Sequence, residues 1–398
     1  MIYWEGFSPA FALGSRQGAR ASALFACAVL LSVGSSAARA DNVLQAYLEQ
    51  TLAAVRNREQ IPALAALVQV NGKVVAEAAM GNRALGHPES VTLDDRWQIG
   101  SDTKAFTATL IGTLVDQRVL AFDDTLETSL PALAKTMHPA YRHVTIRQLL
   151  SHTAGLPPLT NPTELPAALA VVKSVQGLSA QRMTIAGSYL SKPPASAAGA
   201  FVYSNLGYII AGAIAEAHAG KTWESLLRER VFEPLHIRNV GFGPPGHSGK
   251  YEQPLPHGGS EGRTPLDPAD PDSDNPPWLG PAGTINIGLR DWALFAQDQL
   301  DGALGHGRLL QQATYRALQT PVTENYAMGW LAFVNPEGKV KLLTHEGSNG
   351  AWFALISVYP KHDTIILTVT NFGRDAGRSS IEELGKSLWS RLNVADKQ

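Results

Sequence analysis

The dipeptide Asn71-Gly72 is the feature of this sequence that most restricts its fold. It lies between the apolar runs 63–70 and 73–79, and a two-residue turn there needs the positive φ that Asn and Gly tolerate. An amphipathic helix is predicted just before it, over residues 42–57, because the apolar residues recur at helical spacing. A helix followed by an antiparallel hairpin indicates an α+β sheet rather than repeated βαβ units.

The C-terminal third contains further strand patterns, each rich in β-branched and aromatic residues. Strands are predicted over residues 326–334, 340–344, 352–359 and 364–371, and a closing helix over 381–392. Helices at both ends of the chain can then cover one face of a single antiparallel sheet.

A segment after the hairpin combines a hydroxyl with an amine. Phe106, Leu110 and Leu114 recur every four residues, which predicts a helix that begins near Ser101. Lys104 then lies one turn beyond Ser101 on the same side. A lysine of ordinary pKa, about 10.4, does not take a serine proton at neutral pH, whereas a desolvated lysine can. Ser-x-x-Lys alone is also compatible with a capping serine and a surface lysine.

Two later segments carry polar side chains beside predicted helices. Tyr203 and Asn205 lie two residues apart before a helix rich in small residues, where a loop can aim both into a cleft. A core or rim aromatic is the alternative interpretation of Tyr203. His152 follows a helix predicted from Thr145 to Ser151, and we assign it a structural role in preference to that of a general base.

Residues 241–280 are rich in Pro, Gly, Asp and Ser, which predicts a long loop that is either a functional rim or disordered. Within it, Gly258-Gly259-Ser260-Glu261-Gly262 matches Gly-x-Ser-x-Gly. That motif exposes its serine only between a strand and a helix, and neither is predicted here. Ser260 is therefore interpreted as a chance match, as is the neighbouring His257-Gly258-Gly259.

The composition indicates a globular protein, because 44% of the 398 residues are hydrophobic and only 17% are charged. A formal net charge of -2 argues against a nucleic-acid partner bound by charge. No zinc-type Cys/His spacing is present, and we expect neither a metal nor another cofactor.

The N-terminus has the pattern of an export signal. Arg16 and Arg20 precede an apolar run over residues 23–31, and Ala38-Arg39-Ala40 has the small-x-small form of a cleavage site. We therefore expect a signal peptide over 1–40, a mature domain over 41–398, and a periplasmic or secreted location. A membrane anchor is the alternative, but the run is shorter than the roughly 20 residues of a spanning helix, so no stable span is expected after cleavage. Cys27, the single cysteine, lies in the signal, which excludes cysteine catalysis in the mature chain.

Taken together, the segments resemble the penicillin-recognising serine hydrolases, and among them the class C β-lactamase-like branch. That branch includes β-lactamases, D-alanyl-D-alanine carboxypeptidases, D-aminopeptidases and small-ester hydrolases. The resemblance extends from about residue 42 to 392 and rests on four segments. Ser101-Asp102-Thr103-Lys104 matches the family motif Ser-x-x-Lys, and Tyr203-Ser204-Asn205 matches Tyr-x-Asn. His345-Glu346-Gly347 stands in place of Lys-Thr-Gly, and Leu149 to Pro157 matches Leu-Leu-x-His-Thr-x-Gly-Leu-Pro. The resemblance implies a β-lactamase/transpeptidase-like fold, in which terminal helices cover a central antiparallel sheet beside a mostly helical lobe at about 105–240.

The resemblance also implies a role for each matching residue. Ser101 would be the nucleophile, Lys104 its proton acceptor and Tyr203 the second proton-relay group. Asn205 would hold Lys104 and the substrate amide, and the backbone N–H groups of Ser101 and Ser348 would form an oxyanion hole. His345 and Gly347 complete the predicted substrate-binding residues, and the reaction would need no metal.

The third motif departs from the family pattern, because His345 replaces the usual lysine and Glu346 the usual threonine. Histidine is largely neutral above pH ~6.5, so we expect the binding of substrate carboxylates to weaken as the pH rises. The first hypothesis is a hydrolase of amide bonds in β-lactams or D-amino-acid peptides. The second is a carboxylic-ester hydrolase on the same scaffold, and the third is a non-catalytic penicillin-binding sensor. Each takes a small-molecule or peptide ligand.

Overall fold

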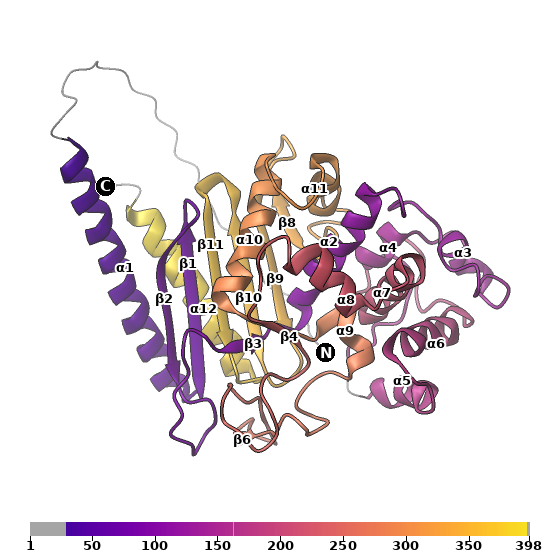
Figure 1. The fold of residues 1–398 in the computed structure, drawn as a ribbon, viewed down its shortest axis with the longest axis horizontal. Helices are drawn as coiled ribbons and strands as arrows, with labels where there is room; N and C mark the ends of the chain where they lie inside the picture. The colour runs from indigo at the N-terminus through magenta and orange to yellow at the C-terminus, as the bar shows by residue number, and fades with distance from the viewer. Residues whose placement is uncertain (1–28, 162, 396–398) are drawn as a thin grey trace.

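The centre of the protein is an antiparallel sheet of six strands in the order β2-β1-β11-β10-β9-β8 (Figure 1). The structure is a computed structural model, and it describes residues 29–161 and 163–395. The strands of this sheet are β1 (Ala63–Val70), β2 (Lys73–Gly81), β8 (Leu331–Val334), β9 (Val340–Ser348), β10 (Phe353–Tyr359) and β11 (Thr364–Thr370). The first and last segments of the chain therefore meet in the middle of the sheet, where β1 pairs with β11.

Helices from both ends of the chain cover one face of this sheet, as the sequence predicted. α1 (Val29–Glu59) and α12 (Asp375–Ala395) pack on the sheet and against each other (Figure 1). Leu48 of α1 and Leu384 of α12 are fully buried in this layer. α10 (Leu289–Leu304) covers the opposite face. The α+β architecture is thus confirmed.

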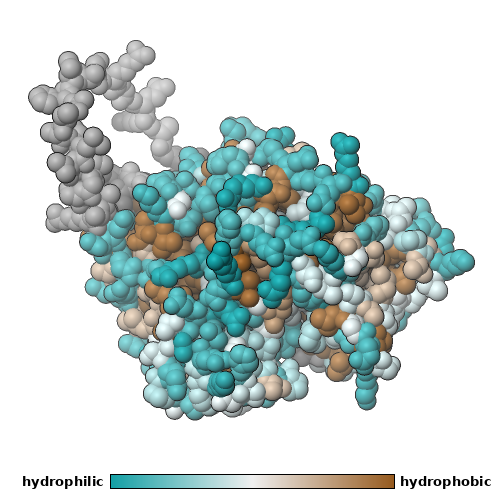
Figure 2. Space-filling view, viewed as in Figure 1, coloured by the Kyte–Doolittle hydropathy of each residue, from teal (hydrophilic) through white to brown (hydrophobic). Residues whose placement is uncertain are grey.

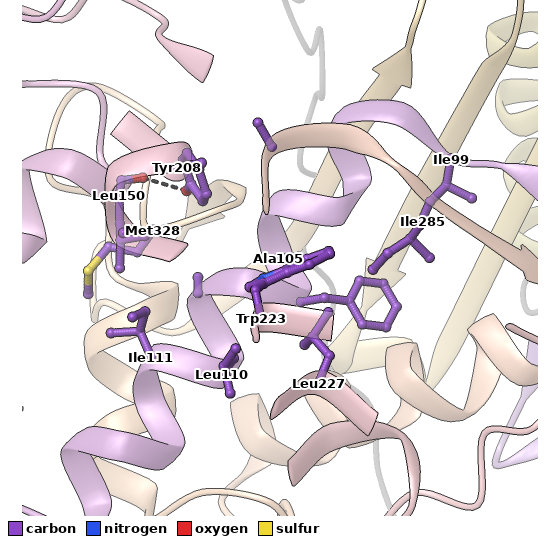
Figure 3. Packing of buried hydrophobic residues seen from close by; sticks show 14 of the residues in the cluster. Ile99, Ala105, Leu110, Ile111, Leu150, Tyr208, Trp223, Leu227, Ile285 and Met328 are labelled. Atoms are coloured by element: carbon purple, nitrogen blue, oxygen red, sulfur yellow. Dashed lines mark hydrogen bonds between the residues drawn. The ribbon is translucent and has the colours of Figure 1, made fainter. Parts of the chain in front are cut away.

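A mostly helical lobe lies on the side of the sheet where β8 forms the edge, next to β9 (Figure 1). Its central helix is α2, whose Leu110 lies beside Trp223 and Leu227 in the core, while its Ile111 lies on the side of Met328 (Figure 3). Burial of each such side chain is worth about 1.5–3 kcal/mol, so packing on all sides fixes the helix that follows Ser101. The helices of the lobe are α2 (Thr103–Asp116), α3 (Leu126–Ser129), α4 (Ile146–Leu150), α5 (Leu165–Val172), α6 (Leu178–Leu190), α7 (Asn205–Ala219), α8 (Trp223–Leu227), α9 (Gly280–Gly283) and α11 (Gln312–Gln319).

A second, three-stranded sheet connects the lobe to the main sheet. It consists of β3 (Arg96–Gln98), β7 (Ile285–Gly288) and β4 (Val240–Phe242), in the order β3-β7-β4. β3 ends immediately before the Ile99-Gly100-Ser101 segment, so this sheet fixes the approach to Ser101.

The Pro/Gly-rich segment 241–280 contains a two-stranded ribbon of β5 (His257–Gly258) and β6 (Thr264–Pro265). Ser260 is exposed in the turn between these strands, and β6 rather than a helix follows it. His257 is buried, accepts a hydrogen bond from Leu85 N–H at 3.1 Å, and has a pKa that burial lowers to about 4. The chance-match interpretation of Ser260 therefore agrees with its surroundings.

Most predicted elements are confirmed, including the hairpin and the helices expected at 42–57, 145–151, 179–192 and 381–392. The strand predicted over 326–334 is wrong in its first half, because only Leu331–Val334 is extended in the sheet. Gly329 has a φ of +83°, and a Cβ there would lie 2.8 Å from the carbonyl oxygen of Lys104. The chain therefore turns against α2 before it enters β8.

Residues 1–28 of the expected signal peptide lie outside the described residues, and α1 begins at Val29 and continues past Ala40. None of the helices in the described part of the chain has the length and apolar character needed to cross a membrane. Figure 2 shows hydrophilic residues over most of one face, with apolar residues in small scattered groups.

Candidate active site

Ser101 and Lys104 meet where the chain enters α2. Ser101 lies in a single 3₁₀ turn, Gly100–Asp102, and Lys104 lies in the first turn of the helix. The Lys104 side chain is fully buried, and its Nζ lies 2.9 Å from Ser101 Oγ. The same Nζ lies 2.8 Å from Asn205 Oδ1 and 2.8 Å from the carbonyl oxygen of Ala282. The structure thus brings together three of the residues that sequence analysis singled out.

Two of the three partners of the lysine can only accept hydrogen bonds. The Asn205 amide is oriented by its Nδ2, which donates to the Leu159 carbonyl at 3.0 Å, so that Oδ1 faces the lysine. The Ala282 carbonyl belongs to α9, and Thr107 of α2 donates to the preceding carbonyl, that of Pro281, at 2.7 Å. A neutral amine has two N–H donors and one lone pair. When both donors bind these two oxygens, the lone pair is left for the hydroxyl of Ser101.

Burial sets the protonation state of this amine. Desolvation lowers the pKa of Lys104 well below its ordinary value, although the neighbouring Asp102 carboxyl opposes the shift. Burial likewise raises the pKa of Asp102 well above its usual range, and the Glu346 carboxylate adds to that rise. Neither carboxyl oxygen of Asp102 has a hydrogen-bond partner among the described residues. Burial thus shifts the pKa of the amine and the pKa of the carboxyl toward each other, in the direction that favours the uncharged form of both groups.

Tyr203 reaches the same point from the loop before α7. Its hydroxyl interacts with the Ser101 side chain, and Lys104 Nζ lies 4.9 Å from the centre of its ring. Burial raises the pKa of Tyr203 above its ordinary value, so the phenol keeps its proton at neutral pH. The loop is held by Ser204, which caps α7 and donates from Oγ to the Pro157 carbonyl at 2.7 Å. The predicted Tyr-x-Asn segment thus lies against Ser101 and Lys104.

Two glycines allow β9 to approach the Ser101 turn closely. A Cβ on Gly347 would lie 1.8 Å from the Ile99 carbonyl oxygen and 2.9 Å from Ser101 N. A Cβ on Gly100, which has a φ of +49°, would lie 2.3 Å from Ser348 N. Only glycine fits at either position. The backbone N–H groups of Ser101 and Ser348, the predicted oxyanion donors, therefore belong to segments in direct contact.

His345 belongs to strand β9 and is only 1% exposed. Its Nε2 lies 3.2 Å from the Tyr326 hydroxyl, which lies 3.0 Å from His152 Nε2. His152 Nδ1 accepts the Ser204 N–H at 3.0 Å, and His345 Nδ1 lies 2.9 Å from the Glu346 carbonyl oxygen. These backbone groups require Nε2–H on His152 and Nδ1–H on His345, so Tyr326 accepts from His152 and donates to His345.

The expectation of a titrating His345 is corrected by this environment. Burial, assisted by the neighbouring Lys104, lowers the pKa of His345 to about 3. The imidazole is therefore neutral at every pH near 7, and it does not lose a positive charge between pH 6 and 8. Glu346 points to the other side of the strand, where its carboxylate accepts a hydrogen bond from Arg378 Nε at 3.0 Å.

Two residues of this network were missed in the sequence. Tyr326 lies in a run that was interpreted as strand, and no local pattern indicates that its hydroxyl joins two histidines. Asp102 lies between Ser101 and Thr103 in a polar segment, so nothing in the sequence indicates that its carboxyl is buried. His152, for which a structural role was expected, binds the Ser204 N–H through Nδ1 and the Tyr326 hydroxyl through Nε2. Among the described residues, no three His, Cys, Asp or Glu side chains are grouped so that they could hold a metal ion.

The chain is similar to known proteins in sequence and in fold. The chain is 29% identical to penicillin-binding protein 4 of Amycolatopsis lactamdurans over 82% of its own length and 85% of that protein. Its fold is similar to that of a class C β-lactamase, with a TM-score of 0.69 and 19% identity over 87% of this chain and 96% of the other. It is similar also to the crystal structure of SurE, with a TM-score of 0.69 and 24% identity over 89% and 76% of the two chains. The model of the β-lactamase family matches residues 42–383, and the chain belongs to that family.

Proposed function

We propose that this protein is a serine hydrolase that forms an acyl-enzyme at Ser101. One observation carries the proposal: Lys104 Nζ is buried between two acceptors, Asn205 Oδ1 and Ala282 O, which bind both N–H groups of a neutral amine and leave its lone pair for the Ser101 hydroxyl at 2.9 Å. An amine in this state is the base that a serine needs to become nucleophilic.

In the acylation step, Ser101 Oγ attacks the substrate carbonyl carbon while its proton passes to Lys104 Nζ. The oxygen of the resulting tetrahedral intermediate is stabilised by the N–H groups of Ser101 and Ser348, and each such donor is typically worth about 10²–10³ in rate. The bond from carbon to the leaving group then breaks. The leaving group takes a proton from the Tyr203 hydroxyl, and Lys104 returns its proton to the phenol, so the cluster ends as it began.

In the deacylation step, water attacks the ester carbon and gives its proton to the same Tyr203–Lys104 cluster. The raised pKa of Tyr203 suits this relay, because its phenolate is a strong base that is present only briefly. The Ser101 oxygen then leaves as an alkoxide and recovers a proton from Lys104.

The amide-hydrolase hypothesis, with β-lactams or D-amino-acid peptides as substrates, draws support from the family and from the name of the Amycolatopsis relative. One observation favours the second candidate, a carboxylic-ester hydrolase. The neutral, 1% exposed His345 does not offer a substrate carboxylate the fixed positive charge of a lysine. An uncharged ester does not need that charge.

Hydrolysis of nitrocefin, a D-Ala-D-Ala peptide and p-nitrophenyl butyrate by the wild type and by Ser101→Ala tests both candidates. We expect turnover of at least one substrate and a loss of kcat of at least ~10³ in the variant. Turnover of the ester alone would reject the amide hypothesis. A lasting penicillin adduct on Ser101 without turnover of any substrate would instead support the sensor hypothesis.

A further inference from the structure

Asp274 joins three separate segments around the predicted oxyanion hole. It lies in the Pro/Gly-rich segment 241–280, to which the proposed function assigns no role. Its Oδ1 accepts hydrogen bonds from Gln98 Nε2 at 2.6 Å, from Asn349 Nδ2 at 2.7 Å and from the Asn275 N–H at 2.7 Å. A single carboxylate oxygen thus connects strand β3, the loop after β9 and the Pro/Gly-rich segment.

The first connection determines how the chain enters the Ser101 turn. Gln98 is the last residue of β3, and its Nε2 also donates to the Gly283 carbonyl at 3.0 Å. These two acceptors fix the orientation of the amide, whose Oε1 accepts the N–H of Gly100. Gln98 therefore holds the backbone directly before Ser101, and Asp274 holds Gln98.

The second connection determines how the chain leaves β9. Asn349 directly follows Ser348, and its Oδ1 accepts the Ala351 N–H at 3.1 Å while its Nδ2 binds Asp274. The loop is thereby tied to the Pro/Gly-rich segment just after the second predicted oxyanion donor.

We propose that Asp274 is a positioning residue that sets the spacing between the N–H groups of Ser101 and Ser348. It does so through Gln98 on one side and Asn349 on the other, without contact with the reacting atoms. The inference rests on the proposed function, because the spacing of these donors matters only when an oxyanion forms between them. Donors fixed before the reaction stabilise the transition state without reorganisation, and a displacement of about 1 Å can cost 10²-fold in rate.

The charge of Asp274 gives this role a pH dependence. Its Oδ2 is buried without a hydrogen-bond partner among the described residues, and burial raises the pKa of Asp274 to about 7, against the three N–H donors that lower it. The groups that face it from β3, from the loop after β9 and from its own segment are amides. Above pH 7 the carboxylate binds its donors most strongly.

The same shift determines the effect of Asp274 on stability. Its pKa is higher in the folded protein than the ordinary value of about 3.9. Its stabilising contribution is therefore complete below pH ~4 and is lost as the pH rises through about 7. Replacement by a neutral isostere consequently leaves the folded protein as stable as the wild type, or more stable, at pH 8.

The test compares Asp274→Asn with Asp272→Asn, which removes the same charge from an exposed position in the same segment. We expect Asp274→Asn to lower kcat about tenfold at pH 8 with little change in KM, and to weaken a boronic-acid transition-state analogue by a similar factor. The ratio of wild-type to variant kcat should rise as the pH passes through about 7. Asp272→Asn should match the wild type.

Wild-type kcat in Asp274→Asn, or an equal loss in Asp272→Asn, would overturn the inference. A loss of kcat that is accompanied by lower thermal stability at pH 8 would assign Asp274 a structural role only. If Asp274→Asn does not fold, Asn349→Ala is tested instead. Asn349→Ala removes one of the three hydrogen-bond donors to Asp274 and lies in a half-buried loop. An unchanged kcat in Asn349→Ala would also overturn the inference. The proposed function itself is tested separately, since it fails if the wild type turns over no substrate or if Ser101→Ala remains active.

Discussion

The hydroxyl of Tyr326 lies 3.2 Å from Nε2 of His345, and its proton points toward that nitrogen because His152 donates to the tyrosine oxygen from the other side. This contact links β9 to the loop that carries Tyr203, since His152 in turn accepts the N–H of Ser204. Two predicted parts of the active site, the third motif and the Tyr-x-Asn segment, are thus connected by one phenol.

Tyr326→Phe should lower both stability and activity. The substitution leaves a buried donor on His152 and a buried acceptor on His345 unpaired, at a cost of about 1–3 kcal/mol each. Urea unfolding measures this loss, and kcat of the folded fraction should fall about tenfold. Tyr315→Phe is the matched control, because it removes a buried hydroxyl that binds Asp298 on α10 at 2.6 Å. Tyr315→Phe should lose stability without loss of kcat. An equal loss of kcat in both variants would contradict the role of Tyr326 in connecting the two parts of the active site.

The neutral state of His345 predicts a pH-independent preference between substrates. Its pKa of about 3 means that no histidinium is lost between pH 5 and 9. The ratio of kcat/KM for a carboxylate-bearing substrate to that for its methyl ester should therefore stay constant over this range, because Lys104 affects both substrates equally. A ratio that falls with an apparent pKa near 6.5 would show a charged imidazole instead.

Buried neutral histidines also predict how stability responds to acid. The pKa of His345 and that of His152 are both lowered by burial, so the unfolded chain binds more protons than the folded protein below pH ~6.5. The contribution of these two histidines to the free energy of unfolding should therefore decrease as the pH falls from about 6.5 toward 3, opposite in sign to the contribution of Asp274. His345→Gln should reduce this slope, and an unchanged slope would contradict the burial of a neutral ring.

Gly347→Ala should inactivate the protein through backbone displacement. The new Cβ would lie 1.8 Å from the Ile99 carbonyl oxygen, so β9 must move away from the Ser101 turn. We expect kcat to fall by at least ~10², the loss typical of a missing oxyanion donor. Gly385→Ala in α12 is the control, because its Cβ would make only an ordinary 3.5 Å contact with Leu355. Measurable activity near the wild-type level in Gly347→Ala would contradict the close approach.

The parts of this fold that are set by neighbouring residues were predictable. Asn71-Gly72 specifies a hairpin by its own backbone preferences, and Ser101 and Lys104 meet because they share one helical turn. The contacts of Asp274 were not predictable, since Gln98 lies 176 residues away and no local pattern encodes the pairing. Tyr326 was wrongly placed in a predicted strand for a related reason. The chain turns at Gly329 against Lys104, and this contact exists only in the folded protein.

The most direct test of the account is covalent labelling with a fluorophosphonate, followed by intact-mass measurement and peptide mapping. A neutral Lys104 beside Ser101 predicts one adduct per chain on the peptide that contains Ser101, complete loss of labelling in Ser101→Ala, and a labelling rate at least ~10² lower in Lys104→Ala. Ser260→Ala should label at the wild-type rate, because Ser260 lies in the exposed β5–β6 turn and is not the proposed nucleophile. An adduct on the Ser260 peptide, or labelling that persists in Ser101→Ala, would contradict the assignment of Ser101 as the nucleophile.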